Sequence, residues 1–392
     1  MVAPGRRGQQ GVPDLGCLPG RHRPGRLIPS GDRHLATDLG VPAQLPVRVT
    51  GIILAASHRA GGGGRAPARP GIADSGGRSP VSAPPRRLVV AVATYRRPQL
   101  LAGLLPLLDE QARAVSSEGL STEILVVDND PEGSAGPEVT ALTLETPLTL
   151  VSEPRPGLTA ARNRILDEAG NAGLLAFIDD DEQPSSGWLT RLLEVMTATE
   201  ATAVTGPVES SPVEPLDMWL KGTEVFARAR HSTGTTRRAL ATNNLLLDLH
   251  QVRDMSLRFD PRFGLTGGED SMFGQSLLRR GGTIVWCDEA VVRERVPEDR
   301  LTRAWALNRA TRSGETWVRV RTVDPPRLRA AGLRLRYAAT GAVRWTLGTA
   351  LALISRARGD AEGLGRHQFS AAGALGMIRG ALGRTIVEYS RG

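Results

Sequence analysis

The sequence has few cysteines and almost no lysine, and each shortage narrows the classes of protein to which it can belong. Cys17 and Cys287 are the only cysteines and neither lies in a CxxC pair, which argues against a disulfide scaffold or a zinc site. We therefore expect a cytoplasmic protein, with a place at the inner face of the cell membrane left open. No unbroken run of eighteen or more apolar residues occurs, so no transmembrane helix is predicted. Lys221 is the only lysine, and the net charge of +8 therefore rests on arginine. That charge suits nucleic acid, anionic lipid or phosphorylated substrates and does not choose among them.

Residues 1–87 differ in composition from the rest of the chain. They are rich in Gly, Pro, Arg and Ser, and only Val49 to Ala56 predicts a short strand. A segment with so few apolar side chains cannot bury enough surface to offset the conformational entropy that it would lose on folding. We expect disorder, or a translation start assigned too far upstream. A nucleic-acid-binding arm is disfavoured because no aromatic residues interleave with the arginines for base stacking.

From Leu88 onwards, strand and helix patterns alternate. The apolar run from Leu88 to Thr94 predicts a buried strand, and Pro98 opens a helix that extends to about Val115. Alternation of this kind is typical of right-handed βαβ units, so the predicted fold is α/β with a Rossmann-like, mostly parallel sheet and flanking helices. Further strands are expected at 122–127, 148–151, 174–178, 201–208, 241–247 and 283–287, and helices at 159–169 (with Thr159 as N-cap), 188–197 and 270–280.

Three consecutive aspartates, Asp179, Asp180 and Asp181, follow the predicted strand 174–178. Like charges this close raise one another's pKa unless a cation neutralises them. Divalent cations that carry a substrate phosphate use one or two carboxylates, which favours a metal–phosphate site. The alternative is a solvated acidic loop that caps a helix starting near Ser185. Polar clusters also end two other strands, at 94–97 and 128–130, and ligands of parallel sheets bind beyond such strand ends.

Candidate roles follow from position along the chain. Asp128 ends the second strand and can accept hydrogen bonds from a nucleotide base or ribose; a simple Asx-turn is the alternative. Asp179 and Asp181 are the metal and ribose candidates, with Asp180 expected to point away from them. Asn243 and Asn244, at a strand start, are candidates for binding acceptor hydroxyls, with a strand-edge turn as the alternative.

A second acidic group begins the helix at 270–280. Gly268 lets a backbone approach a ligand closely, and the adjacent Glu269 and Asp270 are candidates for the catalytic base. The helix dipole alone also favours acids at this position. Arg162 and Asn163 lie on the helix before the fourth strand. They are candidates for contacting the diphosphate of a bound nucleotide or for bracing the aspartates.

Together these motifs resemble family 2 glycosyltransferases of the GT-A fold. The resemblance runs over about 88–296, in the order AVATYRRP, VVDND, GLTAARNRIL, FIDDDEQP, TNNLLL and GGEDSMFGQSLLRRG. The next stretch, VPEDRLTRAWALNRATRSG, is similar to the subset of succinoglycan-type glucosyltransferases.

The resemblance implies an inverting hexosyltransferase with a nucleotide-sugar donor and Mn²⁺ or Mg²⁺. A base-reading aspartate of this family usually meets uracil, so a UDP-sugar is the favoured donor. No nucleic-acid partner is expected. The resemblance implies that Thr94, Tyr95 and Arg97 line the nucleotide pocket and that Asp128 reads the base. The other expected donor contacts are Arg162, Asn163, Asp179 and Asp180. The expected acceptor contacts, from their positions, are Asn243, Asn244 and Gly268. The resemblance implies Asp179 and Asp181 as metal ligands, the latter favoured, and Asp270 as the base beside Glu269.

The sequence departs from the processive members of the family. Their (Q/R)xxRW motif is incomplete, because Arg300 and Arg303 have the spacing but Ala304 stands in place of tryptophan, with Trp305 one position later. We therefore expect a non-processive enzyme of polysaccharide or cell-envelope biosynthesis that adds one sugar to a glycan, lipid-linked or small glycosylated acceptor. The predicted division is a catalytic domain at 88–299 and a helical, basic extension at 300–392.

Two other functions stay open at this point. A nucleotidyltransferase on a similar sheet would normally carry a glycine-rich phosphate loop after the first strand, where this chain has TYRRP. A non-enzymatic nucleic-acid-binding or membrane-binding protein would explain the charge but not the acids at strand ends. The tail from Ala338 to Arg384 is expected either to lie on an anionic membrane surface or to form a helical cap on the catalytic domain.

Overall fold

The computed structural model describes residues 86–117 and 119–384. The strand expected at Val49 to Ala56, and all but the last two residues of the N-terminal segment 1–87, lie outside these ranges. The predicted boundary between 299 and 300 stays a prediction. In the structure β10 ends at Val296, α8 begins at Arg303, and the short helix η2 (Glu298–Arg300) lies between them.

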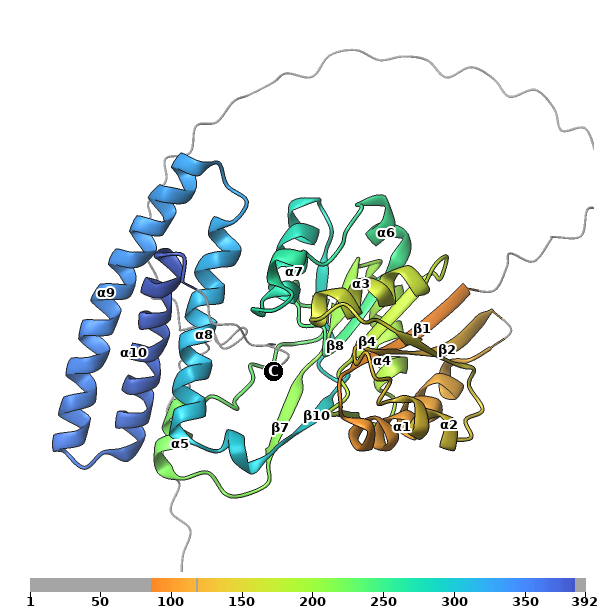
Figure 1. The fold of residues 1–392 in the computed structure, drawn as a ribbon, viewed down its shortest axis with the longest axis horizontal. Coiled ribbons are helices and arrows are strands. Elements are labelled where there is room, and N and C mark those ends of the chain that lie inside the picture. Colours follow the sequence, from red (N-terminus) through yellow and green to blue (C-terminus); the bar gives the residue numbers. More distant parts are fainter. Residues whose placement is uncertain (1–85, 118, 385–392) are drawn as a thin grey trace, which may run out of the picture. The chain divides into compact units, whose positions relative to one another are not determined.

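A seven-stranded sheet forms the centre of the fold (Figure 1). Its strand order is β3-β2-β1-β4-β8-β6-β9. β8 runs antiparallel to β4 and β6, and the other pairings are parallel, which confirms the mostly parallel sheet. The strands are β1 (Arg86–Thr94), β2 (Leu120–Asp128), β3 (Leu148–Ser152), β4 (Leu174–Ile178), β6 (Ala203–Thr205), β8 (Asn244–Asp248) and β9 (Ile284–Trp286).

Helices cover both faces of this sheet because successive strand residues point to opposite sides. Val90 of β1 faces the cluster that contains Leu105 of α1 and Leu192 of α4. Its neighbour Val89 faces the cluster that contains Ile165 of α3. The helices are α1 (Pro98–Val115), α2 (Gly136–Ala141), α3 (Leu158–Glu168), α4 (Trp188–Thr199), α5 (Met218–Thr223), α6 (Leu249–Asp254) and α7 (Glu269–Arg279), with the 3₁₀ helix η1 (Pro261–Phe263) before α7.

A second, three-stranded sheet corrects the sequence prediction. It consists of β5 (Glu182–Pro184), β10 (Val292–Val296) and β7 (Val208–Pro212), in that order. The single strand expected at 201–208 is thus divided between β6 and β7, which belong to different sheets. β9 is not the last strand, because β10 follows it. Strands as short as three residues carry no readable periodicity, which is why β5 was not predicted.

One predicted helix cap is wrong, and an alternative one is excluded. Thr159 is not the N-cap of α3; that position is Gly157, with φ of 104°, where a side chain would collide with the backbone of Gly264. The aspartates at 179–181 do not cap the next helix, because α4 begins at Trp188 after Gly187 and has no side-chain cap. The acidic-cap interpretation of these aspartates is therefore excluded.

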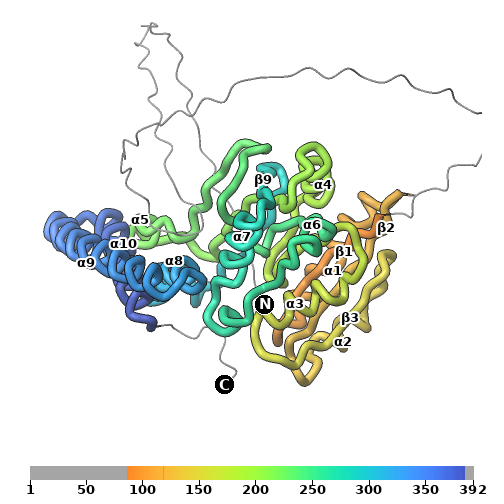
Figure 2. The backbone as a smooth tube through the Cα atoms, turned by 90° about the horizontal axis from the view of Figure 1, so that it is seen from above, coloured from red at the N-terminus to blue at the C-terminus, as the bar shows by residue number. Residues whose placement is uncertain are grey.

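The C-terminal part is helical, as predicted. It contains α8 (Arg303–Thr322), α9 (Arg327–Ala357) and α10 (Ala361–Ala381) (Figures 1 and 2). α10 packs against both α8 and α9 through small residues, since a Cβ atom added at Gly314 or Gly341 would collide with the α10 backbone. Within the described part of the chain, no helix is long and apolar enough to cross a membrane.

Candidate active site

Asp180 is the buried member of the aspartate run. It accepts hydrogen bonds from Thr94 Oγ1 at 2.7 Å and from Arg97 Nη1 at 3.0 Å. Burial raises the pKa of Asp180, and Arg97 and Thr94 oppose the rise. Asp180 therefore ties the end of β4 to the end of β1, while the same Arg97 nitrogen also reaches Asp181 Oδ2 at 3.2 Å.

Asp179 is more accessible, with 39% of its side chain exposed, and its Oδ1 lies 3.5 Å from Arg162 Nη2. Burial by the surrounding protein raises its pKa to about 6; Arg162 opposes the rise, and Asp181, Asp180 and Asp270 reinforce it. Burial is therefore the main cause of the raised pKa of Asp179, and the neighbouring arginine does not offset it.

Arg162 connects this strand end to α7. Its Nη1 donates to Glu269 Oε1, and both side chains are only 5% exposed. Burial raises the pKa of Glu269 to about 7, with Arg162 opposing and Asp270 reinforcing the rise. Asp270 is the next residue in the first turn of α7; it is half-buried and its Oδ1 accepts from the backbone N–H of Ser271 at 2.7 Å. The predicted metal side and the predicted base side thus form one site.

Arg300 also reaches this site, which the sequence analysis did not predict. Its Nη2 lies 3.6 Å from Asp181 Oδ2, and its Nη1 donates to Glu294 Oε1 at 2.6 Å. Arg97, Arg162 and Arg300 come from three different elements, so the carboxylates at the end of β4 are surrounded by guanidinium groups. The only signal in the sequence was the spacing of Arg300 within an incomplete (Q/R)xxRW motif.

Glu182, the first residue of β5, is a second residue that the sequence analysis missed. It is buried, its Oε1 accepts from Asn243 Nδ2 at 2.6 Å, and its Oε2 forms no hydrogen bond within the described residues. Burial raises its pKa well above the usual range, reinforced by Asp179, Asp181 and Glu294. Asn243 is therefore brought to the acidic cluster through Glu182.

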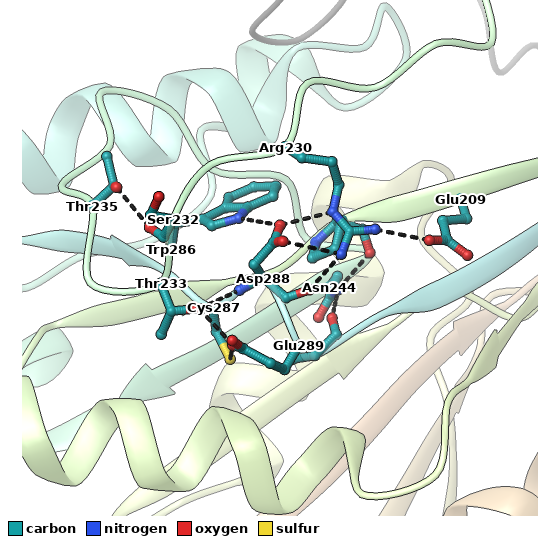
Figure 3. Close-up of polar contacts among 12 residues, drawn as sticks. Glu209, Arg230, Ser232, Thr233, Thr235, Asn244, Trp286, Cys287, Asp288 and Glu289 are labelled. Carbon is teal, nitrogen blue, oxygen red and sulfur yellow. Dashed lines mark hydrogen bonds and ion pairs between the residues drawn. The ribbon is translucent and has the colours of Figure 1, made fainter. Parts of the chain in front are cut away.

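Asn244 is not brought to the site, which corrects its predicted role in acceptor binding. Its side chain is fully buried, and Nδ2 donates to the carbonyls of Pro207 at 3.0 Å and Ala290 at 2.7 Å (Figure 3). Its Oδ1 accepts from Trp188 Nε1 at 2.9 Å. A residue with both ends of its amide engaged in the core holds strands together and has no surface for an acceptor.

The basic loop between α5 and β8 is fixed to the end of β9 (Figure 3). Arg230 pairs with Glu209 at 2.8 Å and with Asp288 at 2.7 Å. Asp288 also accepts from Trp286 Nε1 at 3.0 Å. These contacts give the loop a defined position.

Three other predicted donor contacts have local partners. Both oxygens of Asp128 accept backbone N–H groups, from Asp130 at 2.9 Å and Ala135 at 2.8 Å, which is the turn alternative. The prediction that Asn163 braces the aspartates is wrong. Its side-chain amide donates to Phe259 O at 2.9 Å and accepts from Phe259 N at 3.0 Å. The ring of Tyr95 lies 5.3 Å from the Arg96 guanidinium.

Gly268 precedes α7 with φ of 94°. A side chain there would collide with Cγ2 of Thr316 on α8. Gly268 therefore allows α8 to pack closely against the start of α7, and this packing takes the place of the predicted acceptor contact.

The carboxylates fit a divalent cation that is shared with a substrate. Among residues 86–117 and 119–384, no three His, Cys, Asp or Glu side chains are grouped to hold a metal ion by themselves. A cation that also binds a diphosphate needs only one or two carboxylates. Asp179 and Asp181 supply hard oxygen donors. Burial and the neighbouring carboxylates raise the pKa of Asp179, and a bound cation would offset both effects.

Comparison with known proteins identifies the family. The profile described as "Glycosyl transferase family 2" matches residues 89–255. The succinoglycan biosynthesis protein ExoM of Rhizobium meliloti (strain 1021) is 35% identical over 315 residues, which cover 76% of this chain and 94% of that protein.

Among solved structures, mannosyltransferase PcManGT from Pyrobaculum calidifontis in complex with GDP-Man and Mn²⁺ has a TM-score of 0.46 at 18% identity, covering 75% of this chain and 88% of that one. S. aureus TarS 1–349 in complex with UDP-GlcNAc has a TM-score of 0.44 at 12% identity, covering 78% and 97%. The chain is a glycosyltransferase of the GT-A fold and belongs to glycosyltransferase family 2.

Proposed function

We propose that the chain transfers one sugar, with inversion, from a nucleotide-sugar donor to a hydroxyl group of a glycan, lipid-linked or small glycosylated acceptor. The observation that carries this proposal is the bridge through Arg162, which places the strand-end carboxylate Asp179 and the first turn of α7 in one site. The name of the relative ExoM, a succinoglycan biosynthesis protein, supports polysaccharide biosynthesis as the setting.

Inversion needs a base on the side of the anomeric carbon opposite the leaving diphosphate. We assign this role to Asp270, whose Oδ1 is oriented by the backbone of Ser271. In the proposed step the acceptor hydroxyl gives its proton to Asp270 and its oxygen bonds to the anomeric carbon. The bond between that carbon and the phosphate oxygen breaks, and the nucleoside diphosphate leaves with the electron pair.

The leaving diphosphate needs its negative charge balanced. Asp179 and Asp181 would hold Mn²⁺ or Mg²⁺, which supplies Lewis-acid stabilisation of the phosphate oxygens when bound. Arg97 and Arg300 each contact Asp181 and present guanidinium donors beside the same position. Guanidinium groups bind phosphate oxygens in bidentate fashion, so these arginines are proposed to orient the diphosphate.

Glu269 is assigned a positioning role beside the base. It is buried and paired with Arg162, whereas Asp270 is half-buried and accepts only from the backbone N–H of Ser271 among the hydrogen bonds described above. A carboxylate held by a buried arginine is poorly placed to meet an acceptor. This contrast favours Asp270 over Glu269 for proton transfer.

The base assignment is tested with Asp270→Asn. We expect transfer to fall by about 10²–10⁴-fold, the usual contribution of a general base, while the donor Kd changes little. Asp167→Asn is the matched control, because Asp167 forms a half-exposed surface pair with Arg258. Retained turnover in the Asp270 variant would show that another group is the base.

The cation assignment is tested separately, with donor binding as its measurement. Asp181→Ala should remove the part of donor affinity that depends on Mn²⁺, and EDTA should have the same effect on the unmodified chain. Donor binding that persists in EDTA argues against a metal role. A thermal-shift screen with UDP-, GDP- and dTDP-sugars in the presence of Mn²⁺ then identifies the nucleotide, for which the sequence resemblance favours UDP.

A further inference from the structure

The outward side of α9 is an uncharged strip that no other described element covers. Four of its large apolar side chains are among the most exposed in the described part of the chain: Leu328 at 90%, Leu335 at 74%, Val343 at 68% and Leu353 at 63%. At about 100° per residue they fall on one side of the helix, together with Gly332, Ala339, Thr346, Ala350 and Ala357, all of which are exposed. We call these nine residues the outer strip. Exposed apolar surface this continuous usually marks an interaction site.

The opposite side of α9 is already used. Its buried residues include Ala330, Gly341, Gly348 and Ala352, and the two glycines lie against α10. α9 is the outermost of the three C-terminal helices (Figures 1 and 2). The outer strip lies on the side of α9 opposite the two glycines that contact α10. An amphipathic helix normally turns its apolar side inward, whereas α9 turns small residues inward and large apolar residues outward.

The charges of α9 identify the kind of partner. The helix contains six arginines and no aspartate or glutamate. Arg327, Arg334 and Arg356 follow one edge of the outer strip, and Arg329 and Arg336 follow the other. None of these five forms an ion pair with another residue in the described ranges. An apolar strip bordered by arginines on both edges is complementary to a bilayer of anionic phospholipid, whose headgroups lie above an apolar interior.

We propose that α9 docks along its length on the surface of an anionic phospholipid bilayer, with the outer strip in the headgroup–acyl boundary and the arginines at the phosphates. With 31 residues, the helix would lie about 46 Å along the surface. A second copy of this chain would not suit the outer strip as a partner, because docking two such faces would place arginines against arginines. Residues 1–85 are themselves rich in arginine and offer little complementary charge. The docking rests on α9 alone and does not depend on the proposed sugar transfer.

The test is flotation of the full chain with phosphatidylcholine vesicles, with and without about one-third phosphatidylglycerol. We expect binding to the anionic vesicles that is at least about tenfold stronger than binding to neutral ones. The triple variant Leu335→Glu, Val343→Glu, Leu353→Glu should lower that binding by about tenfold or more. The matched control is Leu100→Glu, Met218→Glu, Val213→Glu, which changes the charge equally at exposed apolar residues outside α9 and should bind as the unmodified chain does.

A second pair of variants tests the arginines without touching the apolar strip. Arg329→Gln, Arg334→Gln, Arg336→Gln should abolish the preference for anionic vesicles. Arg191→Gln, Arg258→Gln, Arg293→Gln removes the same charge from exposed sites elsewhere and should retain it. Equal losses in both sets would show only a general charge effect and overturn the proposal. So would failure of the unmodified chain to float, or a dimer that the α9 glutamates dissociate while vesicle binding is unchanged. Thermal unfolding of each variant establishes that it is folded.

Discussion

Arg162 on α3 and Glu269 on α7 form a buried ion pair between residues 107 positions apart in the sequence. The same guanidinium reaches Asp179 at the end of β4. One buried cation therefore faces two carboxylates, of which one belongs to the predicted metal site and the other lies beside the predicted base. Removing a single partner from such a group leaves charge uncompensated in the protein interior.

Arg162→Met should therefore destabilise the chain strongly while conserving most of the side-chain volume. We expect the free energy of unfolding at pH 7.5 to fall by about 3–5 kcal/mol, the usual cost of breaking a buried pair from one side. The loss should be smaller at pH 5, because Asp179 and Glu269 are then largely protonated and carry little unpaired charge. Chemical denaturation measures both values. Arg258→Met is the control: its pair with Asp167 is about half exposed, so its loss should stay within about 1 kcal/mol. Similar losses in the two variants would contradict the role of burial.

The raised pKa values of Asp179 and Glu269 predict a dependence of stability on pH. They are about 6 and about 7 in the folded chain, whereas unfolded aspartate and glutamate titrate near about 4. The folded state therefore holds protons that the unfolded state has lost. The stability contributed in this way is present below about pH 4 and is lost as the pH rises through about 6 to 7.

Asp179→Asn removes one of these titrations. In the absence of added divalent cations, the variant should be more stable than the unmodified chain at pH 7.5 by on the order of 1 kcal/mol, a value reduced because Asp179 is 39% exposed. At pH 4 the two should be equally stable. Thermal unfolding across this pH range measures the difference, and Asp299→Asn on exposed η2 provides the control. Curves that fall in parallel for Asp179→Asn and the unmodified chain would show that this carboxyl does not titrate as described.

Arg300 and Arg303 share the spacing of one motif but differ in their surroundings. Arg300 contacts Asp181 and Glu294 in the site, whereas Arg303 lies 3.8 Å from Asp217 and over the ring of Trp219. Arg300→Gln should weaken donor binding by about 10- to 100-fold, because a hydrogen bond to a charged group contributes about 1.5–3 kcal/mol. Arg303→Gln should change it less than about threefold. Calorimetric titration with a nucleotide sugar measures both effects, and equal effects would contradict the proposed contact between Arg300 and the donor.

The parts of the fold that the sequence predicted well are those with strong local signals. The apolar runs at 88–94 and 174–178 fix buried strands, and polar residues that end neighbouring parallel strands must meet at one edge of the sheet. Asp179, Asp180 and Asp181 were placed in this way. Pairings between distant segments, such as Arg162 with Glu269, leave no trace in a single sequence, because either residue alone is compatible with a solvated surface.

Asn243 and Asn244 show why residue-level assignments fail where element-level ones succeed. Asn243 lies in the turn that precedes β8, whereas Asn244 is the first residue of the strand, so the two adjacent asparagines have different surroundings. The pairing register decides between them: Asn244 lies opposite Ile178 of β4 and its side chain enters the core, while Asn243 reaches Glu182. Glu182 was missed for a related reason, since its three-residue strand becomes visible only when β10 pairs with it.

Gly268 and Gly281 allow backbone strain to be separated from packing against α8. Their φ values are 94° and 88°, so alanine at either position should cost about 1–2 kcal/mol for the left-handed backbone. Only Gly268 faces a neighbour, because an added Cβ would meet Cγ2 of Thr316, whereas nothing lies within 4 Å at Gly281. Gly268→Ala should therefore cost about 1–3 kcal/mol more than Gly281→Ala, the usual penalty for overpacking.

The additional Thr316→Ser substitution removes the methyl group that causes the collision. It should recover most of the excess loss of Gly268→Ala and none of the loss of Gly281→Ala, as measured by chemical denaturation of the two double variants. Because Gly268 precedes Glu269 and Asp270, Gly268→Ala should also lower kcat, and Thr316→Ser should partly restore it. If Thr316→Ser rescued both glycine variants equally, it would act through general stability, and α8 would not position the first turn of α7.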